Sequence, residues 1–449
     1  MKLDVWMEAV EAPVGKLERH ADKSLEFAYA RGVPKEGRLS AALPIKNTPF
    51  GDAACTAFFG NLLFEGRELD RVMAAHRIDR GDIGGLLFHL GADCAGAVSI
   101  TPAGSGPGKR PGVFPDDYEE VQAARLAELV RSLHFHGRLP EGARDPSPVA
   151  GVQPKIAVLH HDGRFFLPRE GSRAPTTHIL KVSPRDDLDL ARHEVALLSL
   201  ASRLGIETAE GAYLEFHDRE TGADIGTILT RRFDRFFDGA TVRRVHSEDL
   251  CQAMGLARHL KYERDAVSPD IRFSMRAVGE IARRTARPAL FQIGFLRQTL
   301  FNLAVGNTDN HAKNTTILYR QPAGELAPLY DVIPAIMDAR VTHELALTLG
   351  GASFAEDLSI AHLERAMGDL GFARSRFSGQ WPKLLKEVAR TGVPFLAEAG
   401  GKTLADAVAA QLSTLEDALG IDLEVPPRDY FPRSVRDEKA PRGGWTTLS

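Results

Sequence analysis

Three stretches decide the fold of this chain: residues 155–168, KIAVLHHDGRFFLP, residues 177–182, THILKV, and residues 188–206, LDLARHEVALLSLASRLGI. The first stretch holds two apolar runs around Asp162-Gly163, a dipeptide favoured in tight hairpins because both residues adopt positive φ. The second is typical of a short strand. The third has the apolar spacing of a helix and ends at a glycine. We therefore predict a β-hairpin, a third strand and a helix, in that order.

Two charged residues interrupt this apolar pattern. Lys181 lies in the middle of the third strand, and Glu194 lies on the apolar stripe of the helix. A buried carboxylate is costly unless a cation pairs with it, so we predict an ion pair between Lys181 and Glu194. The N-lobe of protein kinases has this layout, and there the pair positions the lysine on the nucleotide phosphates. Taken alone, the pattern also fits a surface lysine and a glutamate at the margin of the stripe.

A second kinase-like pattern follows the long apolar stretch LFQIGFLRQTLFNLAV. Residues 305–318 read VGNTDNHAKNTTIL, with Asp309 and Asn314 five positions apart. The catalytic aspartate and a metal-binding asparagine have this spacing in protein kinases. A carboxylate there can accept a hydroxyl proton, and the amide oxygen can coordinate magnesium. By itself the pattern is weak evidence, because a polar loop in any protein can contain it.

Asp331 completes the set, within the apolar run LAPLYDVIPA at residues 326–335. An acid in such surroundings needs a partner or a cation, and its kinase counterpart holds the magnesium that bridges the β- and γ-phosphates. The alternative is an aspartate that caps the turn before Pro334. Since the lysine, the glutamate, the loop and this aspartate occur in kinase order, together they favour a kinase more strongly than any one does.

Composition excludes several classes of protein. The 449 residues contain 56 basic and 60 acidic side chains, so the formal charge of -4 provides no chain-wide positive field for nucleic acid or anionic lipid. Hydrophobic residues make up 43% of the chain, but no apolar run is long enough to span a membrane. The three cysteines form no C-x-x-C pair. We expect a globular protein of the cytoplasm, without membrane association.

The sequence resembles the HipA family of serine/threonine kinases, the toxin half of bacterial type II toxin–antitoxin pairs. The resemblance is carried, in order, by AGVQPK, THILKV, RRFDR, EDLCQAMGL, VGNTDNHAKN and PLYDVIPA, and near the N-terminus by FFGNLLFEG and LGADCAGAVSI. It implies an α+β protein with a bilobal protein-kinase-like fold, in which a β-rich N-lobe, a helical C-lobe and an additional N-terminal α/β subdomain are present. The G-x-G-x-x-G, H-R-D and D-F-G spellings of standard protein kinases are absent.

Five parts are expected along the chain. They are an N-terminal HipA-type subdomain in residues 1–105, a linker and bridging helix in 106–145, a kinase N-lobe in 146–236, a helical C-lobe in 237–430, and a polar tail in 431–449. The first boundary follows from the Gly/Pro-rich run TPAGSGPGKRPG, which no regular element can contain. Helices are predicted from Tyr118 to Leu133 and over SEDLCQAMGL, where Ser247 would be the N-cap.

The resemblance also implies an activity. The expected function is Mg-ATP-dependent phosphorylation of a protein serine or threonine, and aminoacyl-tRNA synthetases are the substrate class of the family. A small helix-turn-helix antitoxin, similar to HipB, would bind the kinase and anchor it on operator DNA. Two alternatives remain: a small-molecule kinase with the same lobe plan, and a catalytically inactive corepressor.

The resemblance assigns roles to individual residues. Asp309 corresponds to the general base, Asn314 and Asp331 to the magnesium ligands, and Lys181, with Glu194, to the phosphate contact. The remaining nucleotide contacts would be the phosphate loop, Ala150, Gly151, Val152, Gln153 and Lys155; the hinge, Arg231, Arg232 and Phe233, with Asp234 near the ribose; and His311, Lys313 and Tyr330.

Two positions depart from the family pattern. Arg231 stands where an acidic residue is expected at the hinge. Pro148 stands where the family commonly has a serine that is autophosphorylated to silence the kinase, and Ser147 lies one residue earlier. Because proline has no hydroxyl, we expect either that Ser147 has taken over or that this self-inactivation is missing.

Overall fold

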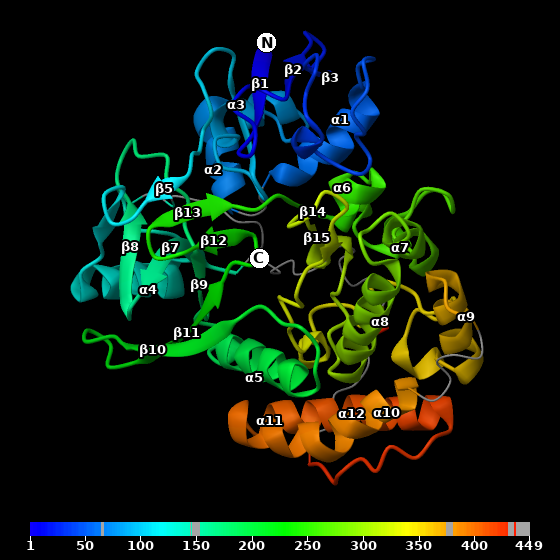
Figure 1. The fold of residues 1–449 in the computed structure, drawn as a ribbon. Helices are drawn as coiled ribbons and strands as arrows, with labels where there is room; N and C mark the ends of the chain where they lie inside the picture. The colour runs from blue at the N-terminus through cyan, green and yellow to red at the C-terminus, as the bar shows by residue number, and fades with distance from the viewer. Residues whose placement is uncertain (64–66, 144, 146–152, 374–379, 430–434, 437–449) are drawn as a thin grey trace. The chain divides into compact units, whose positions relative to one another are not determined.

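The computed structural model describes the chain except residues 64–66, 144, 146–152, 374–379, 430–434 and 437–449 (Figure 1). The chain forms two compact units. The first comprises residues 1–188, 212–258 and 317–324, and the second comprises residues 189–211, 259–316 and 325–449. Among the described residues, no helix is both long and apolar enough to cross a lipid bilayer.

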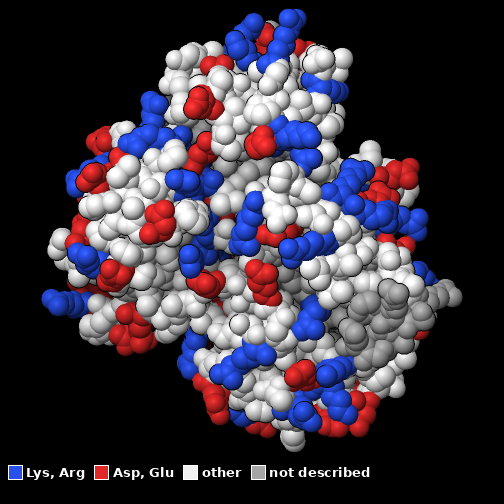
Figure 2. All heavy atoms as spheres, in the orientation of Figure 1, with Lys and Arg blue, Asp and Glu red and all other residues white. Residues whose placement is uncertain are grey.

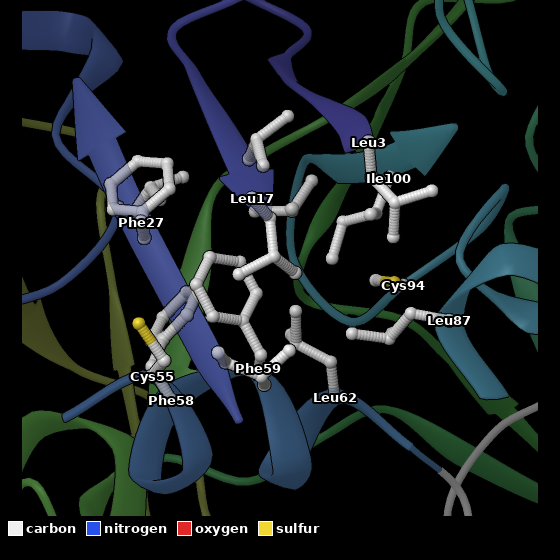
Figure 3. Packing of buried hydrophobic residues seen from close by; sticks show 14 of the residues in the cluster. Leu3, Leu17, Phe27, Cys55, Phe58, Phe59, Leu62, Leu87, Cys94 and Ile100 are labelled. Carbon is white, nitrogen blue, oxygen red and sulfur yellow. The ribbon is translucent and has the colours of Figure 1, made fainter. Parts of the chain in front are cut away.

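An antiparallel sheet of order β3-β2-β1-β4 opens the first unit. Its strands are β1 Lys2–Met7, β2 Gly15–Arg19, β3 Leu25–Tyr29 and β4 Val98–Pro102, and between β3 and β4 lie η1 Lys35–Gly37, α1 Asp52–Phe59, η2 Gly60–Leu62, α2 Arg67–His76 and α3 Ile83–Leu90. Alternate residues of β1 are fully buried, and Figure 3 shows Leu3, Leu17 and Phe27 packed with Phe59 of α1 and Leu87 of α3. This apolar core holds the N-terminal part together.

A second sheet of the first unit has the order β10-β11-β9-β7-β8-β6. Its strands are β6 Tyr118–Glu120, β7 Lys155–His161, β8 Arg164–Pro168, β9 His178–Val182, β10 Gly211–His217 and β11 Asp224–Arg231. The predicted hairpin is confirmed: β7 and β8 pair antiparallel, and the turn residues Asp162 and Gly163 have φ of 48° and 74°. The predicted third strand is β9, which lies between β7 and β11.

The helix α4, Ala123–His136, packs its leucines against this sheet. The prediction that the helix begins at Tyr118 was wrong, because Tyr118–Glu120 forms strand β6 and pairs with β8 instead. Tyr118 is buried on this edge strand of the sheet, and its hydroxyl donates to the Pro175 carbonyl at 2.8 Å. Tertiary pairing therefore overrides the helical spacing in this first turn.

The last elements of the first unit are short. They are β5 Gly112–Val113, β12 Arg235–Phe237, β13 Thr241–Arg244, β14 Ser247–Asp249 and α6 Leu250–Met254. The predicted N-cap Ser247 was wrong: Asp249 caps α6, since its side chain accepts from the Gln252 amide while the Gln252 side chain accepts from the Asp249 amide. Ser247 instead lies in the preceding strand.

Arg244 of β13 is the centre of a buried ionic network. Its Nε lies 2.7 Å from Glu8 Oε2, and its Nη1 lies 3.4 Å from Asp93 Oδ1 and 2.9 Å from the Val98 carbonyl. Lys109 Nζ lies 3.5 Å from the other Asp93 oxygen. Because Arg244 lies on β13, in the three-stranded sheet β12-β13-β5, and Glu8 and Asp93 belong to the N-terminal part, the network joins this small sheet to the N-terminal part of the first unit.

Glu248 of β14 gives a prediction about stability and pH. It is buried and accepts hydrogen bonds from Tyr319 Oη and, at 3.0 Å, from the Ala41 amide. Burial raises the pKa of Glu248 from its ordinary value of 4.5 to about 7. The folded protein therefore binds this proton more tightly than the unfolded chain, and the stabilisation, present below pH 4.5, is lost as the pH rises to 7.

We therefore expect Glu248→Gln, which cannot ionise but still accepts both hydrogen bonds, to remove this pH dependence. Between those pH limits the difference in free energy of unfolding between the two proteins should change by roughly 3 kcal/mol. Urea titrations of both proteins at several pH values measure it. Parallel pH profiles would contradict the prediction.

The second unit is mostly helical (Figure 1). Its elements are α5 Leu190–Arg203, η3 Arg258–Leu260, η4 Glu263–Asp265, α7 Met275–Ala282, α8 Pro288–Ala304, η5 Ala312–Asn314, β16 Glu325–Leu326, η6 Ala335–Met337, η7 Ala355–Asp357, α9 Ile360–Leu370, α10 Gln380–Glu387, the π-helix Val388–Gly392, α11 Val393–Ala399 and α12 Lys402–Leu419. Strand β15, Thr316–Leu318, begins at the last residue of the segment 259–316 and belongs mainly to the first unit. The helix predicted over residues 188–206 is α5, followed by Gly205 with φ of 72°. In α8, proline occupies the first turn, where its missing N–H is not needed.

The surface carries charges of both signs. Figure 2 shows basic and acidic side chains intermixed over the face that it draws. This mixture accords with the formal charge of -4. The three cysteines, Cys55, Cys94 and Cys251, are buried, and none of them forms a disulfide.

Candidate active site

A sharp turn follows α8 and positions the loop of residues 305–314. Gly306 has φ of 72°, and a Cβ there would lie 2.4 Å from side-chain atoms of Ile336, so only glycine fits. The next residue, Asn307, donates its amide to the Asn302 carbonyl at 2.8 Å and its Nδ2 to Asn302 Oδ1 at 2.9 Å. These buried contacts fix the backbone from which Asp309 projects.

Asp309 is held by a tyrosine. Tyr262 Oη donates to Asp309 Oδ1 at 2.6 Å. Burial raises the pKa of Asp309 to about 6, against the lowering effects of this hydrogen bond and of Lys261; the charge of Asp331 raises it further. A carboxyl group with a pKa near the working pH is suited to accept a proton from a substrate hydroxyl.

Asn314 is oriented by the same loop. Its Nδ2 donates to the Asp309 carbonyl at 3.1 Å, and that carbonyl also accepts from the His311 amide at 2.8 Å. Since the amide nitrogen is used in this way, the amide oxygen is the atom that Asn314 offers to a metal. His311 is buried, and burial with the neighbouring lysines lowers its pKa well below 6.5, so this ring is neutral.

Asp331 has an unusual backbone. Its φ is 57°, in the left-handed region that residues with a Cβ rarely occupy, and such conformations gather at functional sites. The preceding Tyr330 is fixed by hydrogen bonds of its hydroxyl to the Lys313 carbonyl at 2.9 Å and to Thr316 Oγ1 at 2.7 Å. The strained aspartate is therefore held to the loop of residues 305–314 through its neighbour Tyr330.

The donor set around Asp331 fits magnesium. The carboxylates of Asp309 and Asp331 repel each other, and a cation would relieve that repulsion. Asn314 and Asp331 supply the oxygen ligands that Mg²⁺ prefers, and Mg²⁺ commonly takes only one or two protein ligands beside phosphates and water. In the described part of the chain, no cluster of three or more His, Cys, Asp or Glu side chains could hold a metal ion.

Sequence reasoning missed Tyr262. Tyr262 is 1% exposed, and the centre of its ring lies 4.0 Å from the Arg264 guanidinium carbon. The His311 ring meets it edge-on, with 5.2 Å between the two ring centres. A buried tyrosine needs a partner for its hydroxyl. That partner is 47 positions away in sequence, so no local pattern could have named Asp309.

In the first unit, two predicted phosphate contacts lie side by side. Lys155 of β7 and Lys181 of β9 are directly opposite each other in the antiparallel register, on the sheet face away from the core that includes Ile156 and Leu180. Like charges at opposite positions are unfavourable in a sheet, and an anion between them would relieve this. The predicted contact Gln153 donates its Nε2 to the Val182 carbonyl at 3.4 Å.

The predicted hinge forms a buried ionic cluster. Asp234 accepts two hydrogen bonds of 2.9 Å from Arg232 and lies 2.7 Å from Arg235. Burial alone would raise the pKa of Asp234, but the two guanidinium groups hold it well below its usual range. Arg231, at the end of β11, is exposed, and Phe233 is half-buried.

The described residues thus bring together two sets of the predicted site residues. In the second unit these are Asp309, His311, Lys313, Asn314, Tyr330 and Asp331; in the first they are Gln153, Lys155 and Lys181, beside the hinge. Glu194 is buried on α5 in the second unit, so its pairing with Lys181 stays a prediction. Ala150, Gly151 and Val152, and also Ser147 and Pro148, lie outside the described residues.

Two protein-family models match the chain. The model of the HipA N-terminal domain matches residues 3–101, and that of the HipA-like C-terminal domain matches residues 147–392. Y4mE of Sinorhizobium fredii, which carries a provisional kinase name, is 30% identical over 358 residues, covering 78% of this chain and 80% of its own length. The serine/threonine-protein kinase toxin HipA of Shewanella oneidensis is 27% identical over 361 residues, covering 78% of this chain and 79% of its own.

A solved structure has the same fold. It is the Shewanella oneidensis complex of HipA, HipB and operator DNA, of which one chain matches with a TM-score of 0.73 at 23% identity. The match covers 94% of this chain and 98% of that chain. The predicted α+β, kinase-like fold is confirmed.

Proposed function

The chain belongs to the HipA family of serine/threonine kinases, and from that premise we propose that it is the toxin of a bacterial type II toxin–antitoxin pair, which uses Mg-ATP to phosphorylate a protein. The observation that carries this proposal is the geometry of Asp309, held by Tyr262 at 2.6 Å beside Asn314 and Asp331. A catalytically inactive corepressor would not need a carboxylate that is positioned to accept a proton.

In the proposed reaction, Asp309 accepts the proton of a substrate serine or threonine hydroxyl. The hydroxyl oxygen then forms a bond to the γ-phosphorus, the bond from that phosphorus to the bridging oxygen breaks, and ADP leaves. Tyr262 keeps the carboxylate in one rotamer by its hydrogen bond. The loop backbone at Asp309 is held by Asn314 and His311.

Asn314 and Asp331 would hold the magnesium ion. When bound, Mg²⁺ neutralises charge on the β- and γ-phosphates. Lys155 and Lys181 would add positive charge to the phosphates, since both lie on one face of adjacent strands. We assign the phosphate loop to residues 150–155, adenine to the backbone of residues 231–233, and the further nucleotide contacts to Glu194, Asp234, His311, Lys313 and Tyr330.

The partners follow from the family. We propose that a helix-turn-helix antitoxin similar to HipB binds this kinase and supplies most of the contact with operator DNA, because a chain of charge -4 has little attraction for DNA itself. An aminoacyl-tRNA synthetase is the proposed substrate, and its phosphorylation in the cytoplasm would slow translation and growth. The five-part division of the chain given above is kept as part of this proposal.

Labelled ATP, magnesium and a bacterial lysate test the function. Transfer of label to one protein band by the natural chain, but not by an Asp309→Asn variant, is the expected result. Label found only in a small molecule would favour the metabolite kinase instead. Absence of any Asp309-dependent label would favour the inactive corepressor.

Tyr262→Phe tests how Asp309 is held. The variant loses one hydrogen bond to a charged group, an interaction worth about 1.5–3 kcal/mol, so kcat should fall by about 10- to 100-fold. The KM for ATP should stay unchanged, because the hydroxyl contacts the base and not the nucleotide sites. Steady-state kinetics of the variant measure both constants.

Tyr213→Phe, which changes a partly exposed tyrosine of β10 in the other unit, is the matched control. A rise in KM for Tyr262→Phe with unchanged kcat would contradict the assigned role.

A further inference from the structure

Two residues near the C-terminus bind back onto the second unit. The amide of His343 donates to the Val435 carbonyl at 3.1 Å, and the Thr342 hydroxyl donates to the same carbonyl at 3.4 Å. The Val435 amide donates to His343 Nδ1 at 3.1 Å. Both main-chain groups of Val435 are therefore bound by residues 342–343, through one main-chain hydrogen bond and two side-chain hydrogen bonds.

Arg436 follows with a set of side-chain contacts. Its Nε lies 2.6 Å from Glu356 Oε1, and its Nη2 lies 2.8 Å from Asp357 Oδ1. Its guanidinium carbon also lies 4.4 Å from the centre of the Phe354 ring. Two carboxylates and one aromatic face thus surround a single arginine side chain. This arrangement binds the planar guanidinium of an arginine better than the ammonium group of a lysine.

The receiving segment is tied to the catalytic loop. The Ala346 amide donates to the Thr308 carbonyl at 3.0 Å, one residue before Asp309. The Ala346 carbonyl accepts from the Glu263 amide at 2.9 Å, one residue after Tyr262. His343 is three residues from Ala346, which is about 10 Å along an extended chain. A peptide on residues 342–343 would therefore lie within a few residues of the catalytic base.

We propose that residues 342–343, with Phe354, Glu356 and Asp357, form a docking site for an extended segment of the protein substrate that carries an arginine, and that Val435 and Arg436 of the chain itself occupy this site. The substrate must then displace the chain's own segment, which restrains the kinase. The assignment of the competing ligand as substrate rests on the proposed kinase function; occupation of the site by the chain's own segment does not.

The ion pairs of Arg436 are weak enough for a competing ligand to displace this segment. The Arg436 side chain is 45% exposed, and its carboxylate partners are 32% and 49% exposed, so each ion pair is weak. A weak contact within one chain is nevertheless favoured by a high effective concentration. The preceding Asp429 is anchored by its amide to Asp406 Oδ2 at 3.2 Å, six residues before Val435.

A peptide-binding experiment tests the docking site without relying on catalysis. The probe is a fluorescent synthetic peptide of residues 431–439, FPRSVRDEK. In the Arg436→Glu variant of the full chain, the occupying segment should be released, and this variant should bind the peptide at least tenfold more tightly than the natural chain does. A peptide with glutamate in place of the same arginine should not bind. Equal affinities of both proteins, no binding to the variant, or binding of the altered peptide would each overturn the docking site.

A second measurement addresses the restraint. Arg436→Glu should transfer label to the protein band of the lysate assay at least threefold faster than the natural chain, and equal rates would overturn the restraint. If neither protein transfers label, the proposed kinase function fails, whereas the peptide result still decides the docking site. The matched control is Arg276→Glu, which reverses another exposed arginine of the same unit, paired with Asp369 at 3.0 Å; it should behave as the natural chain in both measurements.

Discussion

Asp309→Asn is expected to lower kcat of the kinase reaction by about 10²- to 10⁴-fold, the usual contribution of a general base. The amide has nearly the same shape as the carboxylate and still accepts the hydrogen bond from Tyr262 Oη, so the loop should keep its structure. Because the residues proposed to bind Mg-ATP are unchanged, the nucleotide should still bind. Single-turnover kinetics and a nucleotide-binding titration measure the two effects separately.

A matched control for this variant is Asn310→Asp, which changes the next residue and places the carboxylate one position away from the Tyr262 contact. It should not restore activity when combined with Asp309→Asn. A fall of less than tenfold in kcat for Asp309→Asn would mean that another group accepts the proton. It would contradict the role of Asp309 on which the proposed function depends.

Arg244→Ala is expected to destabilise the first unit by about 3–5 kcal/mol, the usual effect of removing one partner from a buried ionic network. The substitution leaves the Glu8 and Asp93 carboxylates, 6% and 5% exposed, without the guanidinium that lies 2.7 Å and 3.4 Å from them. It also removes the donors to the Val98 carbonyl and to Ser99 Oγ. Denaturant titration of the two proteins measures the change in free energy of unfolding.

Arg243→Ala is the control for this variant, because the neighbouring arginine on β13 is exposed and surface substitutions usually change stability by less than about 0.5 kcal/mol. Equal free energies of unfolding for the two variants would show that the network contributes little. In that case other contacts, such as the hydrogen bond from the Ala41 amide to Glu248, would hold the N-terminal part to the region of β13 and β14.

Local sequence predicted the elements whose signals are local. The Asp162-Gly163 hairpin, strand β9 and helix α5 follow from turn chemistry and apolar periodicity, and all are present. The roles of Asp309, Asn314 and Asp331 were predicted because these residues follow the order of a kinase, and these roles stay predictions. The start of α4 and the cap of α6 were misjudged, since strand pairing at Tyr118 and the capping box of Asp249 compete with helical spacing.

Contacts between distant segments could not be predicted. Tyr262 meets Asp309 across 47 positions, and the amide of His343 meets the Val435 carbonyl across 92 positions. The five-part division also gave no sign that Arg244 would be buried against Glu8. In each case the two partners meet only because the chain folds, and the periodicity of the local sequence does not indicate which residues will meet.

The Arg244 network has a consequence for protein engineering. The two family-model matches, residues 3–101 and 147–392, invite recombination between relatives at the join. Glu8 and Asp93 fall in the first match and Arg244 in the second, so a hybrid that takes each half from a different parent keeps the network only if the other parent carries matching charges at these positions. A hybrid without that match should be less stable than either parent.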